Sequence, residues 1–165
     1  MWLVAKIKKK EFQLFKKSIV ENIKNAQIYT PKYECSAKTK SKKIIKFILN
    51  SYVFINSPNF SDDSLIRKLK YTKGLEYMLE GFKSNQNQIV EFINYCKKNE
   101  DLQGNLNQSF FLNLPHTTFK FVSGPFRNFV LNLLSIKKKN LKTEYNGKII
   151  SFKSDTKFLL VPEKL

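Results

Sequence analysis

The spacing of apolar residues changes once along this chain of 165 residues, and that change limits the folds open to it. Residues 9–25 carry an apolar residue every three or four positions, in the stripe Phe12, Phe15, Ile19 and Ile23. Such spacing predicts one buried face of an amphipathic helix, and a second stripe of this kind runs through residues 86–98. After residue 114 the apolar residues form only short, strand-like runs. We therefore expect a mixed α and β part followed by an all-β part.

The first part, residues 1–99, is predicted to be an α+β sandwich. Strands are expected at residues 2–7, 26–33, 44–55 and 75–79. Ser61-Asp62-Asp63 favours the start of a further helix, because such side chains accept hydrogen bonds from the free N–H groups of a first turn. Gly74 is expected to end that helix. This order of elements predicts helices packed on a mostly antiparallel sheet.

Residues 100–114 are poor in core-forming residues and are predicted to be a linker. The second part, residues 115–165, contains strand-like runs at 118–122, 129–136, 141–145, 149–152 and 158–161. Asn146 and Gly147 tolerate positive φ, which a two-residue type I′ hairpin requires. Five short strands in so small a region predict a barrel, because closure leaves no exposed strand edge.

The formal net charge of +17 has two explanations. Lysines and arginines neutralise phosphates and release counterions, so a polyanionic partner is one of them. The other is composition, since only Arg67 and Arg127 among thirty basic residues are arginines, and lysine, Asn, Ile and Phe are all frequent. A specialised reader of nucleic acid would use more arginine, whose planar fork binds phosphate and guanine in a bidentate way. Both explanations stay open.

The sequence offers little for catalysis. Cys35 and Cys96 lack the spacing of a zinc site and are expected to be free thiols of an intracellular protein. His116 is the single histidine, and no paired carboxylates, glycine-rich phosphate loop or nucleophile motif accompanies it. We expect no enzymatic activity, no cofactor and no metal. The N-terminal apolar run is too short for a signal peptide, and no apolar stretch is long enough to cross a membrane, so a cytoplasmic location is expected.

Three local patterns resemble the NusG/RfaH family of transcription elongation factors. Trp2 opens the first strand and a helix follows at once. Residues 49–55, Leu-Asn-Ser-Tyr-Val-Phe-Ile, are similar to the family's Leu-Phe-Pro-Gly-Tyr-Val-Phe-Val strand, with Tyr-Thr-Lys-Gly-Leu at 71–75 beyond it. Residues 121–129, Phe-Val-Ser-Gly-Pro-Phe-Arg-Asn-Phe, are similar to the entry of the C-terminal KOW barrel. Leu131 stands where the KOW motif usually has glycine, which suggests a divergent paralogue.

The resemblance implies a fold and a function. The fold is a NusG N-terminal (NGN) sandwich with an antiparallel sheet, followed by a small SH3-like barrel. The function is that of an elongation or antitermination factor that binds RNA polymerase and modulates pausing or termination. In RfaH-like proteins the C-terminal domain can also be helical and mask the polymerase-binding surface. Phe126, Phe129, Val130, Leu133 and Leu134 fit helical as well as strand spacing, so both structures stay open here.

The family's N-terminal domain grips the clamp helices of the largest polymerase subunit through a hydrophobic depression. Carried onto this sequence, that surface consists of Val4, Tyr52, Phe54, Ile89 and Ile93. Tyr52 and Phe54 lie two positions apart and share one face of a strand. The pattern fits two interpretations, because the same residues would also serve as an ordinary core.

The resemblance implies two further surfaces. Upstream or non-template DNA would contact the lysines at the end of the first strand and in the Thr-Lys-Gly corner, namely Lys6, Lys8, Lys9, Lys10 and Lys73. Rho or the ribosomal protein NusE would dock on the C-terminal barrel at Phe126 and Phe129. Each lysine also fits a solvated surface, and each phenylalanine also fits the barrel core. A monomer is expected.

The main alternative is a ribosome-associated or other RNA-binding KOW protein. A module that binds RNA on a sheet should carry exposed aromatic rings interleaved with basic residues on one face. We expect no lysine to flank Tyr52 and Phe54 on their face of the sheet. We therefore interpret this strand as part of a protein-binding surface.

Overall fold

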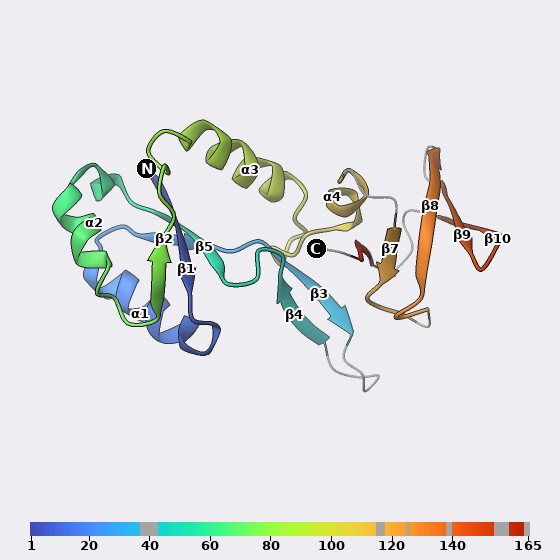
Figure 1. Cartoon of the computed structure of the whole chain (residues 1–165), viewed down its shortest axis with the longest axis horizontal. Helices are drawn as coiled ribbons and strands as arrows, with labels where there is room; N and C mark the ends of the chain where they lie inside the picture. The colour runs from blue at the N-terminus through green and yellow to red at the C-terminus, as the bar shows by residue number, and fades with distance from the viewer. Residues whose placement is uncertain (37–42, 115–117, 125, 138–139, 154–158, 164–165) are drawn as a thin grey trace. The chain divides into compact units, whose positions relative to one another are not determined.

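A computed structural model describes residues 1–36, 43–114, 118–124, 126–137, 140–153 and 159–163. The chain forms two compact units (Figure 1). The first unit consists of Met1–Pro31 and Leu49–Tyr95, and the second of Lys32–Ile48 and Cys96–Leu165. Every ladder within the named sheets is antiparallel, so the predicted α+β class with antiparallel sheets is confirmed.

The first unit is built on a four-stranded sheet with the order β2-β5-β1-β6. Its strands are β1 (Trp2–Ile7), β2 (Gln27–Tyr29), β5 (Tyr52–Asn56) and β6 (Leu75–Met78). The helical segments are η1 (Lys9–Glu11), α1 (Phe12–Asn22), η2 (Pro58–Ser61), α2 (Asp63–Leu69) and α3 (Gln86–Lys98). The predicted bounds of the first strand and of the last helix are confirmed.

The main core of this unit lies between the sheet and the helices α1 and α2. Leu3, Ala5 and Ile7 alternate along β1 and face Phe15 and Ile19 of α1. All five side chains are buried, and burial of each large one contributes roughly 1.5–3 kcal/mol. The stripe that predicted the helix is therefore the stripe that packs on the sheet. Because strand residues alternate, Trp2, Val4 and Lys6 lie on the opposite face of β1.

Two predicted strands are each divided. The run 44–55 forms β4 (Lys43–Phe47) and β5, and a turn separates them. Asn50 in that turn has a φ of 56°, a left-handed conformation that asparagine tolerates and a continuous strand excludes. The run 26–33 forms β2 and β3 (Lys32–Ser36) and is interrupted at Pro31, which has no N–H for a ladder. The strands β3 and β4 pair with each other.

This hairpin changes the division of the chain. Residues 32–48 were expected in a domain of residues 1–99, but they group with the C-terminal residues in the second unit. The backbone N–H of Leu106 donates to the carbonyl of Lys32 at 2.7 Å. The rings of Tyr33 and Phe111 meet edge to face, with 5.4 Å between their centroids. An aromatic contact of this kind adds roughly 0.5–1.5 kcal/mol beyond burial.

The predicted linker, residues 100–114, contains ordered structure. The helix α4 (Gln108–Leu112) buries Phe110 and Phe111. Ahead of it, the carboxylate of Asp101 accepts the backbone N–H groups of Gln103 and Asn105, both at 2.9 Å. Burial alone would raise the pKa of Asp101, but these hydrogen bonds outweigh it and lower the pKa. The polar residues of this segment form a turn at Asp101 and the N-cap of α4, where Asn107 Oδ1 accepts from the N–H groups of Ser109 and Phe110.

The second unit also contains a five-stranded sheet, with the order β10-β9-β8-β7-β11. Its strands are β7 (Thr118–Phe121), β8 (Val130–Lys137), β9 (Asn140–Tyr145), β10 (Lys148–Lys153) and β11 (Leu160–Pro162). Asn146 and Gly147 have φ of 49° and 74°, as the predicted hairpin requires. Of the residues that also fitted a helix, Val130, Leu133 and Leu134 lie in the strand β8, and Phe126 and Phe129 lie in the turn before it. Leu131, in place of the motif's glycine, is 4% exposed and belongs to the core.

The predicted closed barrel is not observed. Within the described residues, β10 and β11 are the two edges of the sheet and do not pair with each other. A side chain, not a strand, pairs with the free edge of β11. Gln108 of α4 accepts from the N–H of Leu160 at 2.7 Å and donates to its carbonyl at 3.1 Å, as a neighbouring strand would. A side-chain amide thus pairs with backbone groups that would otherwise be open to aggregation.

Candidate partner-binding face of the first unit

The candidate site is the face of the first sheet that points away from α1 and α2. The antiparallel register places Val4 opposite Phe54 and Lys6 opposite Tyr52. On the other side of β1, Lys6 is opposite Tyr77 of β6. This face therefore combines apolar, aromatic and basic side chains from three adjacent strands.

The helix α3 covers one part of this face. Val4, Phe54 and Ile93 form one hydrophobic cluster, with exposed fractions of 8%, 5% and 2%. Tyr52 and Ile89 pack at the margin of the cluster and are half-buried. All five residues expected to bind the polymerase clamp thus come together. Three of them are core residues of this chain, so only Tyr52 and Ile89 present accessible surface to a partner.

A glutamine side chain fixes α3 on the sheet. The backbone N–H of Trp2 donates to Gln86 Oε1 at 2.8 Å, and Gln86 Nε2 donates to the carbonyl of Trp2 at 2.6 Å. The register of β6 on β1 begins only at Ala5, so Gln86 takes the place of a strand beside Trp2. Because the N-terminal turn of α3 is anchored in this way, the margin at Tyr52 and Ile89 is preorganised.

The uncovered part of the face, which we call the Tyr52 patch, consists of Lys6, Tyr52 and Tyr77. The hydroxyls of Tyr52 and Tyr77 lie 2.8 Å apart and share a hydrogen bond. Their rings meet edge to face at 6.4 Å, and Tyr77 is 43% exposed. Lys6 Nζ lies 5.4 Å from the centre of the Tyr77 ring and 3.2 Å from the carboxylate of Glu76. The patch offers aromatic surface whose rings are already held in place.

The electrostatics of the patch follow from these contacts. The hydrogen bond with Tyr52 is the main cause that raises the pKa of Tyr77, so the Tyr77 phenol stays neutral at physiological pH. The hydrogen bond to Glu76 raises the pKa of Lys6, which keeps its charge. The inference that no lysine flanks Tyr52 on this face is wrong, because Lys6 flanks it across the sheet.

The other expected nucleic-acid lysines gather at one corner of the unit. The backbone N–H of Lys8 donates to the carbonyl of Gly74 at 2.8 Å, which brings the end of β1 against the loop that carries Lys73. Lys8, Lys9, Lys10 and Lys73, which we call the basic corner, are all exposed. Lys8 lies 4.0 Å from Glu11, and no ion pair is found for the other three within the described residues. Lys6 belongs to the Tyr52 patch instead.

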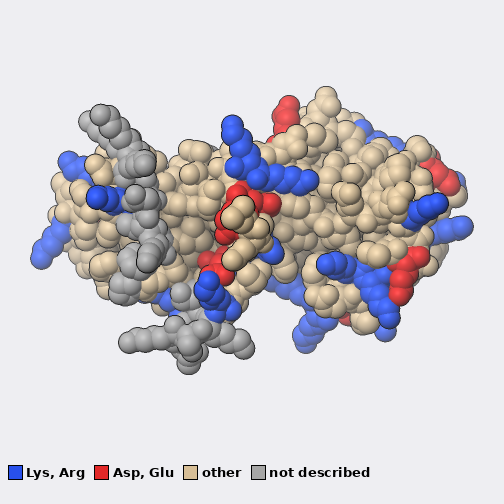
Figure 2. Space-filling model, turned by 180° about the vertical axis from the view of Figure 1, so that it is seen from behind, with Lys and Arg blue, Asp and Glu red and all other residues tan. Residues whose placement is uncertain are grey.

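The basic corner is one part of a widely distributed charge. Figure 2 shows lysine and arginine side chains spread over the visible face, with acidic groups between some of them. Charge alone therefore does not mark a single binding surface.

Substitution of all four lysines of the basic corner by glutamine is expected to lower the affinity for single-stranded DNA. It should also make that affinity less dependent on salt concentration. Each phosphate contact on a single strand contributes about 0.7 to the slope of log K against log salt, so the slope should become shallower by about 3. Titrations of a short oligonucleotide at several salt concentrations measure this. As a matched control, Lys16, Lys17, Lys148 and Lys153 are also exposed, and their substitution should change the slope little. Equal changes for both sets would contradict a localised contact.

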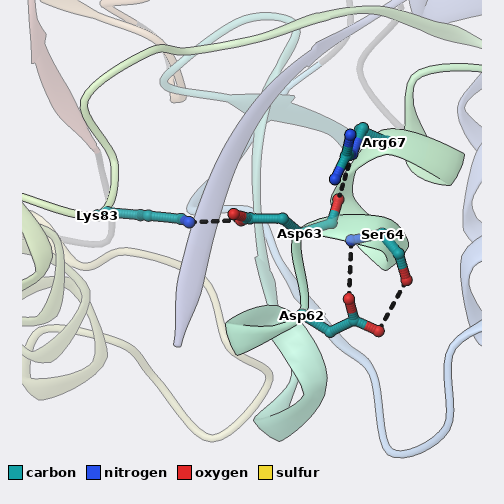
Figure 3. A network of polar contacts seen from close by, with 5 residues as sticks. All are labelled: Asp62, Asp63, Ser64, Arg67 and Lys83. Atoms are coloured by element: carbon teal, nitrogen blue, oxygen red, sulfur yellow. Dashed lines mark hydrogen bonds and ion pairs between the residues drawn. The ribbon is translucent and has the colours of Figure 1, made fainter.

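A polar network anchors the start of α2 (Figure 3). Asp62 accepts from the backbone N–H and from the hydroxyl of Ser64, both at 2.8 Å, and these bonds lower its pKa. Lys83 pairs with Asp63, and Arg67 Nε donates to the Asp63 carbonyl at 3.4 Å. The network connects α2 to the turn that precedes α3. Its members have structural partners within the unit, which explains their positions without a ligand.

The two phenylalanines expected to dock a second partner lie together on the second unit. Phe126 is 39% exposed and Phe129 is 43% exposed, with 6.1 Å between their ring centres. Phe129 stacks on Tyr145 at 5.1 Å, and Phe126 contacts the ring of Phe152 at 6.0 Å. The interpretation of Phe129 as barrel core is wrong for this structure, since nearly half of its side chain is exposed.

The remaining expectations concern chemistry and location. Cys35 and Cys96 are buried and form no disulfide, while His116 lies outside the described residues. Within the described part of the chain, no three His, Cys, Asp or Glu side chains are grouped as a metal site would need. Nor does any helix there have the length and apolar character to span a bilayer.

In comparisons with known proteins, the likenesses found are to solved structures. No family model matches the chain. No curated protein matches it either. The crystal structure of the MjSpt4:Spt5 complex in conformation B contains a similar chain, with 11% sequence identity and a TM-score of 0.30. The likeness covers 99% of this chain and 98% of that one. A TM-score of this size does not establish a shared fold.

Proposed function

We propose that this chain is a transcription elongation factor of the NusG/RfaH kind that binds RNA polymerase through the first sheet. The observation that supports the proposal is the cluster of Val4, Tyr52, Phe54, Ile89 and Ile93. The sequence resemblance assigns these five residues to one contact surface, and they lie together with one side accessible. The chain would act in the cytoplasm as a monomer and would modulate pausing or termination.

The geometry suggests how such a contact would gain affinity. Tyr52 and Tyr77 are held by their mutual hydrogen bond, and α3 is held by Gln86. A partner helix that covers these rings would therefore immobilise few additional rotamers, which keeps the entropic cost of binding low. Buried tyrosines are frequent among the residues that carry most of an interface's binding energy, each about 2 kcal/mol or more. Val4, Phe54 and Ile93 would support the contact from below.

Two further contacts belong to the proposal. The basic corner would follow the backbone of upstream or non-template DNA without reading its sequence. The exposed rings of Phe126 and Phe129 would receive Rho or NusE, and the open five-stranded sheet would stand in for the family's barrel. Each surface would act on a different component of the same transcription complex.

An RNA-binding, ribosome-associated protein is the second candidate. The position of Lys6 favours it, because this lysine lies opposite Tyr52 and over the ring of Tyr77. An exposed ring beside a cation is the arrangement on which unpaired bases stack. The ion pair between Lys6 and Glu76 weighs against it, since the carboxylate would repel a phosphate beside the same ring.

Co-purification after nuclease treatment separates the two candidates. We expect the affinity-tagged chain to retain the large polymerase subunits after DNA and RNA are digested, because the contact is between apolar protein surfaces. A contact made through RNA would be lost in the same treatment. Recovery of ribosomal particles without polymerase would contradict the proposed function and support the second candidate.

A further inference from the structure

The second unit contains a small polar pocket whose lining residues do not include Phe126 or Phe129. Its volume is about 220 Å³, and it is bounded by β3 and β4 on one side and by the β7 and β11 region on the other. The side chains that matter are Tyr33, Cys35, Lys46, Lys120, Arg127 and Glu163. They come from five separate segments of the chain, which meet only in the folded unit.

The pocket has an excess of positive charge. Lys46, Lys120 and Arg127 line it, and Glu163 is the one carboxylate among its lining residues. Within the described residues none of these three cations forms an ion pair with a carboxylate. Like charges gathered around a small volume repel one another, and an anion in that volume would relieve the repulsion. The charge pattern therefore favours an anionic ligand.

Arg127 gives the pocket more specificity than lysines would. It is one of only two arginines in a chain whose other basic residues are lysines. The second, Arg67, is occupied at the start of α2. A guanidinium offers a rigid fork of donors that binds phosphate in a bidentate way, which an ammonium group cannot do.

The backbone holds Arg127 in a fixed turn. Its N–H donates to the carbonyl of Gly124 at 3.2 Å, and the N–H of Asn128 donates to that of Phe121 at 2.9 Å. Gly124 and Asn128 have φ of 80° and 71°, so two left-handed residues define the turn. A backbone this restricted fixes the point from which the Arg127 side chain extends, before any ligand arrives.

Tyr33 supplies a neutral donor at the wall of the pocket. Its side chain is 8% exposed, and its ring is fixed edge to face against Phe111. Burial raises the pKa of the Tyr33 hydroxyl, so the group stays protonated at physiological pH and can donate a hydrogen bond to an anion. It would act beside the charged groups without adding repulsion.

We propose that this pocket binds a phosphate group, with the fork of Arg127 as the main contact and Lys46, Lys120 and the Tyr33 hydroxyl as supporting groups. A phosphate fills only part of the volume, so the ligand is a phosphate carried by a larger molecule. A phosphorylated metabolite and a 5′-phosphorylated nucleic-acid end share this chemistry. The pocket lies in the second unit and the Tyr52 patch in the first, so the proposal does not rest on polymerase binding.

Calorimetric titration of the full chain with inorganic phosphate, at constant ionic strength, tests the site. We expect saturable binding to one site per chain, about tenfold weaker in Arg127→Gln because a bidentate charge-assisted contact is lost. Arg127→Lys keeps the charge but not the fork and should fall between the two. Arg67→Gln makes the same chemical change outside the pocket and should bind as the unaltered chain does. Tyr33→Phe, which removes only the hydroxyl, should weaken binding severalfold.

A second variant distinguishes loss of the phosphate contact from a folding defect of Arg127→Gln. If Arg127→Gln lowers the melting temperature without ligand, Lys120→Gln is the second variant, and its weakened binding would support the site. No saturable binding by the unaltered chain, or equal losses in Arg127→Gln and Arg67→Gln, would overturn the proposal.

Binding of adenosine monophosphate is then compared with that of an oligonucleotide with and without its 5′-phosphate. Preference for the phosphorylated end over the mononucleotide identifies nucleic acid as the source, and equal affinity identifies a small molecule.

Discussion

Gly74→Ala is expected to lower the free energy of unfolding of the first unit by about 3 kcal/mol. Gly74 has a φ of +87°, where a residue with a side chain costs about 1–2 kcal/mol. An added Cβ would lie 3.1 Å from the carbonyl oxygen and Cβ of Glu11 and from the Cβ of Phe15. None of these atoms can rotate away, because they belong to the backbone of η1 and α1 or are bonded to it. Overpacking adds about 1–3 kcal/mol.

Gly147→Ala is the matched control for that effect. Gly147 has a φ of +74°, but its added Cβ would meet nothing within 4 Å. It should therefore show only the conformational cost, about 1–2 kcal/mol. Urea denaturation of the two variants measures both values. Equal losses in the free energy of unfolding for the two variants would show that Gly74 is not in tight contact with the η1–α1 segment. The packing that holds the loop of Lys73 against the end of β1 would then lose its structural basis.

Tyr52→Glu is expected to weaken binding to RNA polymerase by about 30-fold or more. A tyrosine that anchors an interface contributes about 2 kcal/mol, which corresponds to this factor. The carboxylate would also have to be desolvated against the apolar margin of Val4 and Ile89, so the loss should exceed that of simple truncation. Affinity for purified polymerase, measured by a binding titration, gives the number.

Two variants show whether this loss is local. Leu14→Glu places the same charge on α1, on the opposite side of the sheet, at a side chain that is 50% exposed. It should bind as the unaltered chain does. Tyr52→Phe keeps the ring and removes only the hydrogen bond to Tyr77, so its loss should stay within a few-fold. If Leu14→Glu and Tyr52→Glu weaken polymerase binding equally, the effect is a general one of charge, and this result would count against the Tyr52 patch.

The elements with the strongest apolar pattern were predictable from the sequence. The strand β1 and the helix α3 have the predicted bounds, because period and length both identify them. The turn at Asn50 was not predictable, since the apolar residues on both sides of it read as one strand. The sequence also did not predict that the β3–β4 hairpin belongs to the second unit. Its contacts with Leu106 and Phe111 join residues far apart in the sequence.

The sequence predicted which residues lie on the candidate face, but not how many of them α3 buries. Strand alternation placed Tyr52 and Phe54 on one side, and the α3 stripe supplied Ile89 and Ile93. The extent of cover by α3 depends on Gln86, whose partner Trp2 lies at the other end of the unit's sequence. Lys6 and Tyr77 join Tyr52 only through the register of three strands, and no local pattern encodes register. For the same reason the shared pocket of Lys46, Lys120 and Arg127 was not predictable from the sequence.

The most direct test of the central claim is a cross-link from position 52 itself. A photoreactive phenylalanine analogue in place of Tyr52 keeps an aromatic ring at the Tyr52 patch, and mass spectrometry of the product identifies what the ring touches in the cell. The same analogue at Leu14, on the far side of the sheet, reports background contacts. We expect the product from position 52 to be the largest subunit of RNA polymerase, absent from position 14. Cross-links from position 52 to ribosomal RNA or ribosomal proteins, or the same products from both positions, would contradict the assignment of this face to polymerase.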